Sequence, residues 1–156
     1  MFELDIPGFG LLRLEHLVSD FTGTLSVDGR LLPGIKDRLN KIADFLQIHI
    51  LTADTFGMAM TELEGINCDI RILTADNHDL QKEEYVKGLG TDCVAAFGNG
   101  NNDRKMLKAA KIGIAVCLNE GCATDAVISA NIMVTSATDA LDLLLNPKRL
   151  KATLRF

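Results

Sequence analysis

The chain has 156 residues, and its 16 Lys and Arg against 21 Asp and Glu give a formal net charge of −5. With 47% hydrophobic and 24% charged residues it can bury a core, and we expect one globular domain, residues 1–156. The negative charge argues against broad nucleic-acid binding, which depends on clustered Lys and Arg. No apolar run approaches the roughly 20 residues of a membrane-spanning helix. The N-terminus lacks the basic region and apolar run of a secretory signal, so we expect a soluble, cytoplasmic protein that binds no membrane.

Apolar runs alternate with segments of helical periodicity along the whole chain. The first half is expected to contain a strand at residues 11–21, with a short edge strand as an option before it, and a hairpin turn at 27–30. A helix from about 35 to 46, a strand at 47–52 and a helix at 55–64 are expected to follow. Asp54 and Thr55 are expected to cap the last of these helices.

The second half continues the alternation. The expected elements are a strand at 69–73, a helix at 77–89 that ends at Gly90, a strand at 93–97, a helix at 102–110, a strand at 112–116, a helix at 123–129, a strand at 132–134 and a helix at 136–145. Four basic residues then surround Leu150 and Leu154, and we expect this amphipathic segment to pack on its own domain or on a neighbour.

Strands separated by helices of this length predict right-handed βαβ units. The fold class is therefore α/β, a three-layer Rossmann-like fold with a mainly parallel central sheet. In such a sheet, ligands bind beyond the carboxyl ends of the strands.

Cysteine and histidine usage gives no metal-binding pattern. None of the four cysteines forms a Cys-x-x-Cys pair or has a His at zinc spacing, so we expect reduced thiols that pack as small hydrophobes. The three histidines are scattered, and we expect packed or surface side chains rather than ligands. These residues are Cys68, Cys93, Cys117, Cys122, His16, His49 and His78.

Polar residues cluster at three predicted strand ends. Asp20 opens the segment Asp-Phe-Thr-Gly-Thr-Leu, Thr52 closes the second strand, and Gly-Asn-Gly-Asn-Asn-Asp at residues 98–103 follows a later strand. We expect the three clusters to converge at one edge of the sheet.

This combination suits phosphoryl transfer, in which catalysis is mainly positioning and charge neutralisation. Asp20 can act as the nucleophile that forms an aspartyl phosphate. Thr52 can donate a hydrogen bond to the phosphoryl group, Lys82 can supply positive charge, and Gly23 allows close backbone approach. Carboxylate and carbonyl oxygens are the ligands that Mg²⁺ prefers. Lys87 is an alternative to Lys82.

The same segments resemble motifs of the haloacid dehalogenase-like superfamily, and Asp-x-Thr-Gly-Thr at residues 20–24 is similar to the phosphorylation loop of P-type ATPases. Thr52, Lys82 and residues 98–103 then resemble the second, third and fourth motifs. The resemblance implies a Mg²⁺-dependent phosphatase that hydrolyses phosphoric monoesters or acyl phosphates. It implies metal ligation by Asp20, the backbone carbonyl of Thr22, Asn99 and Asp103.

The spacing of these motifs leaves no room for a cap domain or a nucleotide-binding domain. Asp20 and Thr52 are 52 − 20 = 32 positions apart, and Thr52 and Lys82 are 82 − 52 = 30 apart. We therefore expect a capless phosphatase core, not ATP-driven transport. The resemblance to capless members implies either a large substrate or an oligomer in which a second copy of the chain covers the site. We expect a small phosphorylated substrate, with the homo-oligomer as the possible cover.

Two positions depart from the family pattern. Thr22 stands where most members have an Asp that acts as general acid and base, and losing that help costs roughly 10²–10⁴-fold in rate. Asn99 stands where the family usually has a metal-binding Asp. We expect slow turnover.

Two other functions remain open for such a chain. A phosphate-sensing or partner-binding module would keep the fold with hydrolysis largely silenced by Thr22 and Asn99. A response-regulator receiver domain also uses Asp, Thr and Lys, but its phosphoacceptor lies on a middle strand after an acidic pair, whereas Asp20 ends the first core strand.

Overall fold

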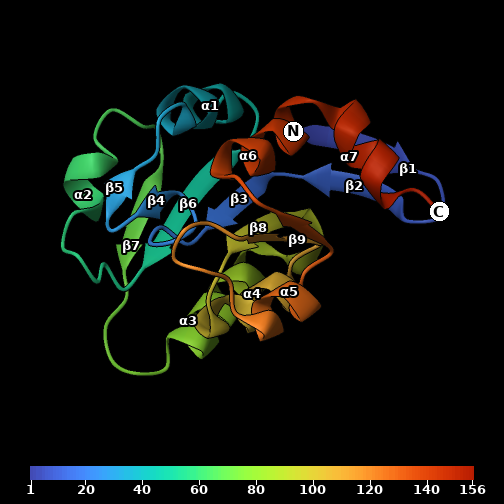
Figure 1. The fold of residues 1–156 in the computed structure, drawn as a ribbon. Helices are drawn as coiled ribbons and strands as arrows, with labels where there is room; N and C mark the ends of the chain where they lie inside the picture. Colours follow the sequence, from blue (N-terminus) through green and yellow to red (C-terminus); the bar gives the residue numbers. More distant parts are fainter.

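The computed structural model describes residues 1–156 and is built around a six-stranded sheet in the order β10-β9-β8-β3-β6-β7 (Figure 1). All of its strand pairs are parallel. The strands are β3 (His16–Ser19), β6 (Gln47–Thr52), β7 (Asp69–Ile72), β8 (Val94–Gly98), β9 (Ile112–Val116) and β10 (Ile132–Val134). The predicted parallel sheet is confirmed.

Helices cover both faces of this sheet. In Figure 1, α1 (Ile35–Ile42) and α6 (Ala137–Leu145) lie on one face, and α3 (His78–Leu89), α4 (Arg104–Ala109) and α5 (Thr124–Ser129) lie on the other. The fold is therefore the predicted three-layer α/β arrangement, because a parallel sheet must bury both of its faces.

Alternating side chains of the strands supply two separate cores. Leu17 faces the larger core, which includes residues of α1 and α6, whereas Val18 faces the smaller core beneath α3 and α4. Phe97 and Ala96 of β8 divide in the same way. The central strands β8 and β9 are apolar throughout because they are buried on both sides, whereas the edge strand β7 is largely exposed.

The predicted single strand at residues 11–21 is wrong. The segment divides into β2 (Gly10–Leu14) and β3, and β2 pairs antiparallel with β1 (Phe2–Ile6) in a separate hairpin. Figure 1 shows this hairpin reaching away from the central sheet, with α7 (Pro147–Leu154) beside it. Leu12 and Leu14 are buried like Leu17 of β3, so buried leucines lie on both sides of the division.

The predicted helix at residues 55–64 is also shorter than expected. Only α2 (Ala59–Glu62) forms, because the backbone turns at Asp54 and Gly57, whose φ angles are 54° and 66°. Asp54 still caps the helix, since its Oδ1 accepts hydrogen bonds from the amides of Met58 and Ala59 at 3.0 Å.

The remaining expected elements are present. Their ends differ by one or two residues, except that α1 ends at Ile42, four residues before the expected end at 46. The hairpin turn joins β4 (Ser26–Val27) to β5 (Arg30–Leu31), and both turn residues have positive φ. The C-terminal helix α7 buries Leu150 against its own chain, as predicted. Short 3₁₀ turns precede β8 (Thr91–Cys93) and α4 (Asn101–Asp103).

The connections between the motif-bearing strands are short. Only the β4–β5 hairpin and α1 lie between β3 and β6, so no cap domain is inserted there. Between β6 and β8 the chain forms α2, β7, α3 and one 3₁₀ turn. None of the helices has the length and apolar character needed to cross a bilayer.

Candidate active site

The three predicted strand ends meet at one edge of the sheet. β3 lies between β6 and β8, so Asp20 stands between Thr52 and Asn99. The chain extends the sheet from β3 first toward β7 and then, through β8, toward β10, which makes this edge a topological switch point. A cavity of about 190 Å³ opens here, lined by Asp20, Thr22, Thr52, Ala53, Thr55, Asn99, Gly100 and Asn102.

Beneath this cavity, Lys82 of α3 joins two carboxylates. Its Nζ lies 2.9 Å from Asp20 Oδ1 and 2.7 Å from Asp103 Oδ1, and the Lys82 side chain has no exposed surface. The alternative lysine, Lys87, instead pairs with Glu83 on the helix surface and is 58% exposed. Lys82 is therefore the lysine that reaches Asp20.

Asp20, Lys82 and Asp103 form a buried triad, and their contacts shift the pKa values of Asp20 and Lys82. Burial raises the pKa of Asp20 from 3.8 to about 6, and the neighbouring Asp103 charge raises it as well, while Lys82 and Thr24 act in the opposite direction. Burial alone would lower the pKa of Lys82, but the two carboxylates outweigh it and raise that pKa above its usual value. One ammonium shared by two carboxylates leaves Asp20 incompletely compensated.

Asp103 also holds the loop that follows β8. Its Oδ2 accepts hydrogen bonds from the amides of Asn99 and Gly100, both at 2.9 Å. A Cβ on Gly98 would lie 2.5 Å from the Cβ of Asp103, so this close approach requires glycine. Both carboxylate oxygens of Asp103 are thus engaged by protein groups, and the side chain is fully buried.

Thr24 is a site residue that was not singled out from the sequence. Its hydroxyl lies 3.1 Å from Asp20 Oδ2 and 3.2 Å from Asn99 Oδ1, so both oxygens lie within hydrogen-bond distance of the same hydroxyl. Asn99 is further held by Gly121, whose carbonyl accepts from Asn99 Nδ2 at 3.2 Å. The signal for Thr24 was present, because it closes the Asp-x-Thr-Gly-Thr segment.

Thr22 and Gly23 lie at the start of the same loop. Thr22 Oγ1 is buried and has no hydrogen-bond partner in the protein. Gly23 has φ +80°, and a Cβ there would lie 2.5 Å from Asn99 Nδ2. Thr22 lines the cavity, and a buried hydroxyl without a protein partner is a group that an ordered water or a ligand can satisfy. The close approach of Gly23 to Asn99 requires glycine.

Thr52 closes β6 with its side chain almost fully buried. Its Oγ1 accepts a hydrogen bond from the Asp54 amide at 2.9 Å, which leaves the hydroxyl proton free to be donated. Thr52 and Asn99 line the cavity from the strand ends on the two sides of β3.

The donor set fits a hard divalent cation. Asp20 and Asn99 offer one carboxylate and one amide oxygen, which both lie within 3.2 Å of the Thr24 hydroxyl. Such oxygen ligands suit Mg²⁺, which keeps several waters and needs only one or two carboxylates. Asp103, with its oxygens already bonded, contributes through the loop that carries Asn99.

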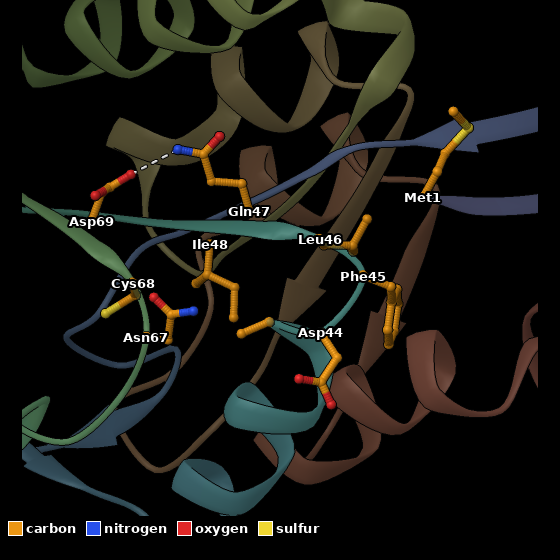
Figure 2. Close-up of a pocket in the computed structure, with 10 residues that line it drawn as sticks. Met1, Asp44, Phe45, Leu46, Gln47, Ile48, Asn67, Cys68 and Asp69 are labelled. Carbon is orange, nitrogen blue, oxygen red and sulfur yellow. Dashed lines mark hydrogen bonds between the residues drawn. The ribbon is translucent and has the colours of Figure 1, made fainter.

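A larger cavity, about 410 Å³, lies at the other end of the sheet (Figure 2). Its walls include Phe45, Leu46 and Ile48, and a hydrogen bond of 2.9 Å joins Gln47 Nε2 to Asp69 Oδ2 at its rim. None of the predicted site residues lines it, so size alone does not indicate the reactive centre.

Known proteins resemble this chain in sequence. A model for haloacid dehalogenase-like hydrolases matches residues 78–142, which contain Lys82, Asn99 and Asp103. An uncharacterized protein of Methanocaldococcus jannaschii is 48% identical over 73 residues, which are 47% of this chain and 78% of that protein. The chain belongs to the haloacid dehalogenase-like hydrolases. It is therefore a hydrolase, as its motifs predicted.

Solved structures share the fold. A cobalt-bound deoxy-D-mannose-octulosonate 8-phosphate phosphatase of Haemophilus influenzae superposes with a TM-score of 0.72 at 12% identity, covering 92% of this chain and 94% of that one. The corresponding Moraxella catarrhalis phosphatase, in complex with magnesium, phosphate and 3-deoxy-D-manno-octulosonate, gives 0.63 at 20% identity, covering 91% and 94%.

A zinc-transporting PIB-type ATPase gives a TM-score of 0.57 at 26% identity. The match covers 79% of this chain but only 20% of the ATPase, so it concerns one part of that protein. The likeness agrees with the ATPase-like form of the Asp20 segment.

Proposed function

We propose that residues 1–156 form one phosphohydrolase core that cleaves phosphoric monoesters or acyl phosphates of small molecules through an aspartyl phosphate at Asp20. One observation carries the proposal. Asp20 is the only ionisable side chain that lines the cavity, and Lys82 holds it from below at 2.9 Å. One structural neighbour, the Moraxella catarrhalis 3-deoxy-D-manno-octulosonate 8-phosphate phosphatase in complex with magnesium and phosphate, supports a small phosphorylated substrate.

The first step is attack of an Asp20 carboxylate oxygen on phosphorus. A new O–P bond forms as the bond from phosphorus to the leaving oxygen breaks, and the leaving group departs with that electron pair. The Thr52 hydroxyl donates a hydrogen bond to a phosphoryl oxygen, and Lys82 partly balances the negative charge of the site.

The second step is attack of water on the phosphorus of the aspartyl phosphate. The bond between the Asp20 oxygen and phosphorus breaks, inorganic phosphate leaves, and the carboxylate is restored. The Thr22 hydroxyl, which has no partner in the protein, can orient this water. The proton of the water passes to solvent, since the cavity has no other acid or base.

Mg²⁺ completes the site in this proposal. Asp20, the Thr22 carbonyl and Asn99 would hold it, and Asp103 would support the Asn99 loop. The ion supplies neutralisation of the charge on the phosphoryl oxygens.

The lining of the cavity predicts which substrates react. With no carboxylic acid beside Asp20 to protonate a leaving group, esters of poor leaving groups should react slowly. Aryl and acyl phosphates have acidic leaving groups that depart without a proton. They are the substrates on which this site should turn over.

The lack of a second carboxylic acid in the cavity also favours a second function, a phosphate-sensing or partner-binding module. If water attack on the aspartyl phosphate is as poorly assisted as its formation, the phosphorylated protein accumulates. Such a chain would be read by a partner in its phosphorylated form and would release phosphate very slowly.

Aryl phosphate hydrolysis tests the proposal directly. The full chain and its Asp20→Asn variant are compared with and without Mg²⁺, and Asp76→Asn serves as a matched control at an exposed position. We expect Mg²⁺-dependent turnover in the unchanged chain and in Asp76→Asn, and none in Asp20→Asn.

Treatment with acetyl phosphate separates the two functions. A single phosphate bound at Asp20 that persists, without release of inorganic phosphate, would support the module instead. Metal-independent turnover, or turnover that survives in Asp20→Asn, would contradict both.

A further inference from the structure

A second group of metal-binding side chains lies at the opposite end of the sheet from Asp20. One ligand atom each of Glu15, His16 and Cys93 lies within 4.8 Å of the other two. Glu15 immediately precedes β3, and Cys93 immediately precedes β8. Because β3 and β8 run parallel, the three residues meet at the amino ends of these strands, whereas Asp20 lies beyond the carboxyl ends.

The backbone fixes this juxtaposition. The Glu15 amide donates to the Cys93 carbonyl at 2.9 Å, and His16 is in register with Val94. The three donors therefore stand on neighbouring, hydrogen-bonded strands. The Glu15 side chain is exposed and the other two are partly buried, so an ion can reach them from solvent.

A buried hydrogen-bonded chain holds the His16 ring in place. His16 Nδ1 lies 3.1 Å from His49 Nε2, and His49 Nδ1 lies 2.8 Å from the Tyr85 hydroxyl. His49 is only 2% exposed. In protein metal sites, a partner on one nitrogen of a ligating His orients the ring and leaves the other nitrogen for the ion. The active site uses none of these three side chains.

We infer that Glu15, His16 and Cys93 form a binding site for Zn²⁺ or a similar borderline-soft divalent cation. Thiolate, imidazole and carboxylate are the protein ligands of zinc, whereas Mg²⁺ takes oxygen ligands alone. Three protein ligands leave the fourth tetrahedral position to water. The site is thus chemically distinct from the oxygen-lined cavity at Asp20.

Binding exchanges a proton for the metal. The Cys93 thiol now donates to the Gly90 carbonyl at 3.1 Å. When the Zn–S bond forms, that proton passes to solvent, and Glu15 supplies its ionised carboxylate. The ion would link the segment before β3 to the segment before β8.

Cobalt titration of the full, metal-free chain without a polyhistidine tag tests the inference. Co²⁺ is added with Mg²⁺ in excess, and thiolate-to-cobalt charge-transfer absorption is followed. We expect the signal to saturate at one equivalent, to be displaced by equimolar Zn²⁺, and to disappear in Cys93→Ser. The exposed Glu15→Gln variant, which disturbs no internal contact, should bind at least tenfold more weakly.

Three control variants locate the signal. Cys68→Ser removes another partly buried thiol, Cys117→Ser with Cys122→Ser removes the remaining pair, and Asp20→Asn alters the active site. All three should keep the absorption. The inference fails if no charge-transfer band appears, if the band survives Cys93→Ser or vanishes with Cys117 and Cys122, or if Glu15→Gln binds with unchanged affinity.

Discussion

Lys82 and Asp103 form an ion pair with no exposed side-chain surface, Nζ to Oδ1 at 2.7 Å, between α3 and the loop after β8. Asp103 binds the amides of that loop with its other oxygen, and Lys82 binds Asp20. One buried charge pair thus connects Asp20, the proposed nucleophile, to the backbone that carries Asn99. The stability of the fold and the proposed catalysis therefore share this contact.

Replacing Lys82 by Ala should destabilise the protein by about 3–5 kcal/mol, because two buried carboxylates then lose their only cationic partner. Urea unfolding measures the loss. Lys87→Ala on the same helix is the control and should stay within about 0.5 kcal/mol, since its lysine is exposed. Equal effects of the two variants would contradict the buried role of Lys82.

Asp20 of the metal-free protein should take up a proton as the pH falls through about 6, because burial and Asp103 raise its pKa from 3.8. The acid form cannot attack phosphorus, so lowering the pH from 7 to 5 should reduce the reactive carboxylate about tenfold. Carbon-13 NMR of the side-chain carboxyl groups measures the midpoint directly.

The Asp20→Asn variant assigns that signal, which should be absent from its spectrum. A midpoint near 3.8 in the unchanged protein would show that Lys82 compensates Asp20 completely. The carboxylate would then stay ionised throughout the working range.

Much of this site could be predicted from sequence because its residues follow strand ends. Once the strands are parallel, Asp20, Thr52 and Asn99 must meet at one edge whatever the helices do. The choice between Lys82 and Lys87 could not be made from the sequence alone. Only the packing of α3 under β3 shows that Lys82 reaches Asp20 and Lys87 does not.

Features that depend on pairing between distant segments were missed. Residues 11–21 divide into two strands that both bury their leucines, so the apolar pattern continued on both sides of the polar pair Glu15-His16 at the division. His16 and His49 lie 33 positions apart, and only the pairing of β3 with β6 brings their rings together. These two histidines, which are scattered in the sequence, are thus neighbours in the fold, and His49 is packed as expected. The cysteines are free, as expected, but only partly buried.

Asn99→Asp should strengthen Mg²⁺ binding. The change adds one negative charge beside Asp20, at an oxygen that already lies 3.2 Å from the Thr24 hydroxyl. Because the charge of the ligands tunes the affinity of carboxylate sites, the Mg²⁺ concentration for half-maximal activity should fall about tenfold. Kinetic titration with Mg²⁺ measures it.

Asn102→Asp is the matched control, since Asn102 lines the same cavity. A fall of the same size in this variant would mean that Mg²⁺ responds to the general charge of the cavity. Only a fall specific to Asn99→Asp agrees with direct ligation.

Thr22→Asp should supply the missing general acid. Thr22 lines the cavity with a hydroxyl that no protein group binds, so a carboxyl group there can face the leaving oxygen without breaking an existing contact. General acid catalysis predicts a gain of roughly 100-fold for an alkyl phosphate, whose leaving group needs a proton. An aryl phosphate should gain much less. The ratio of the two kcat/KM values is the measurement, with Thr55→Asp as a control on the same cavity wall. Equal gains on both substrates would show that the new carboxylate acts by binding metal or by charge, and not by donating a proton.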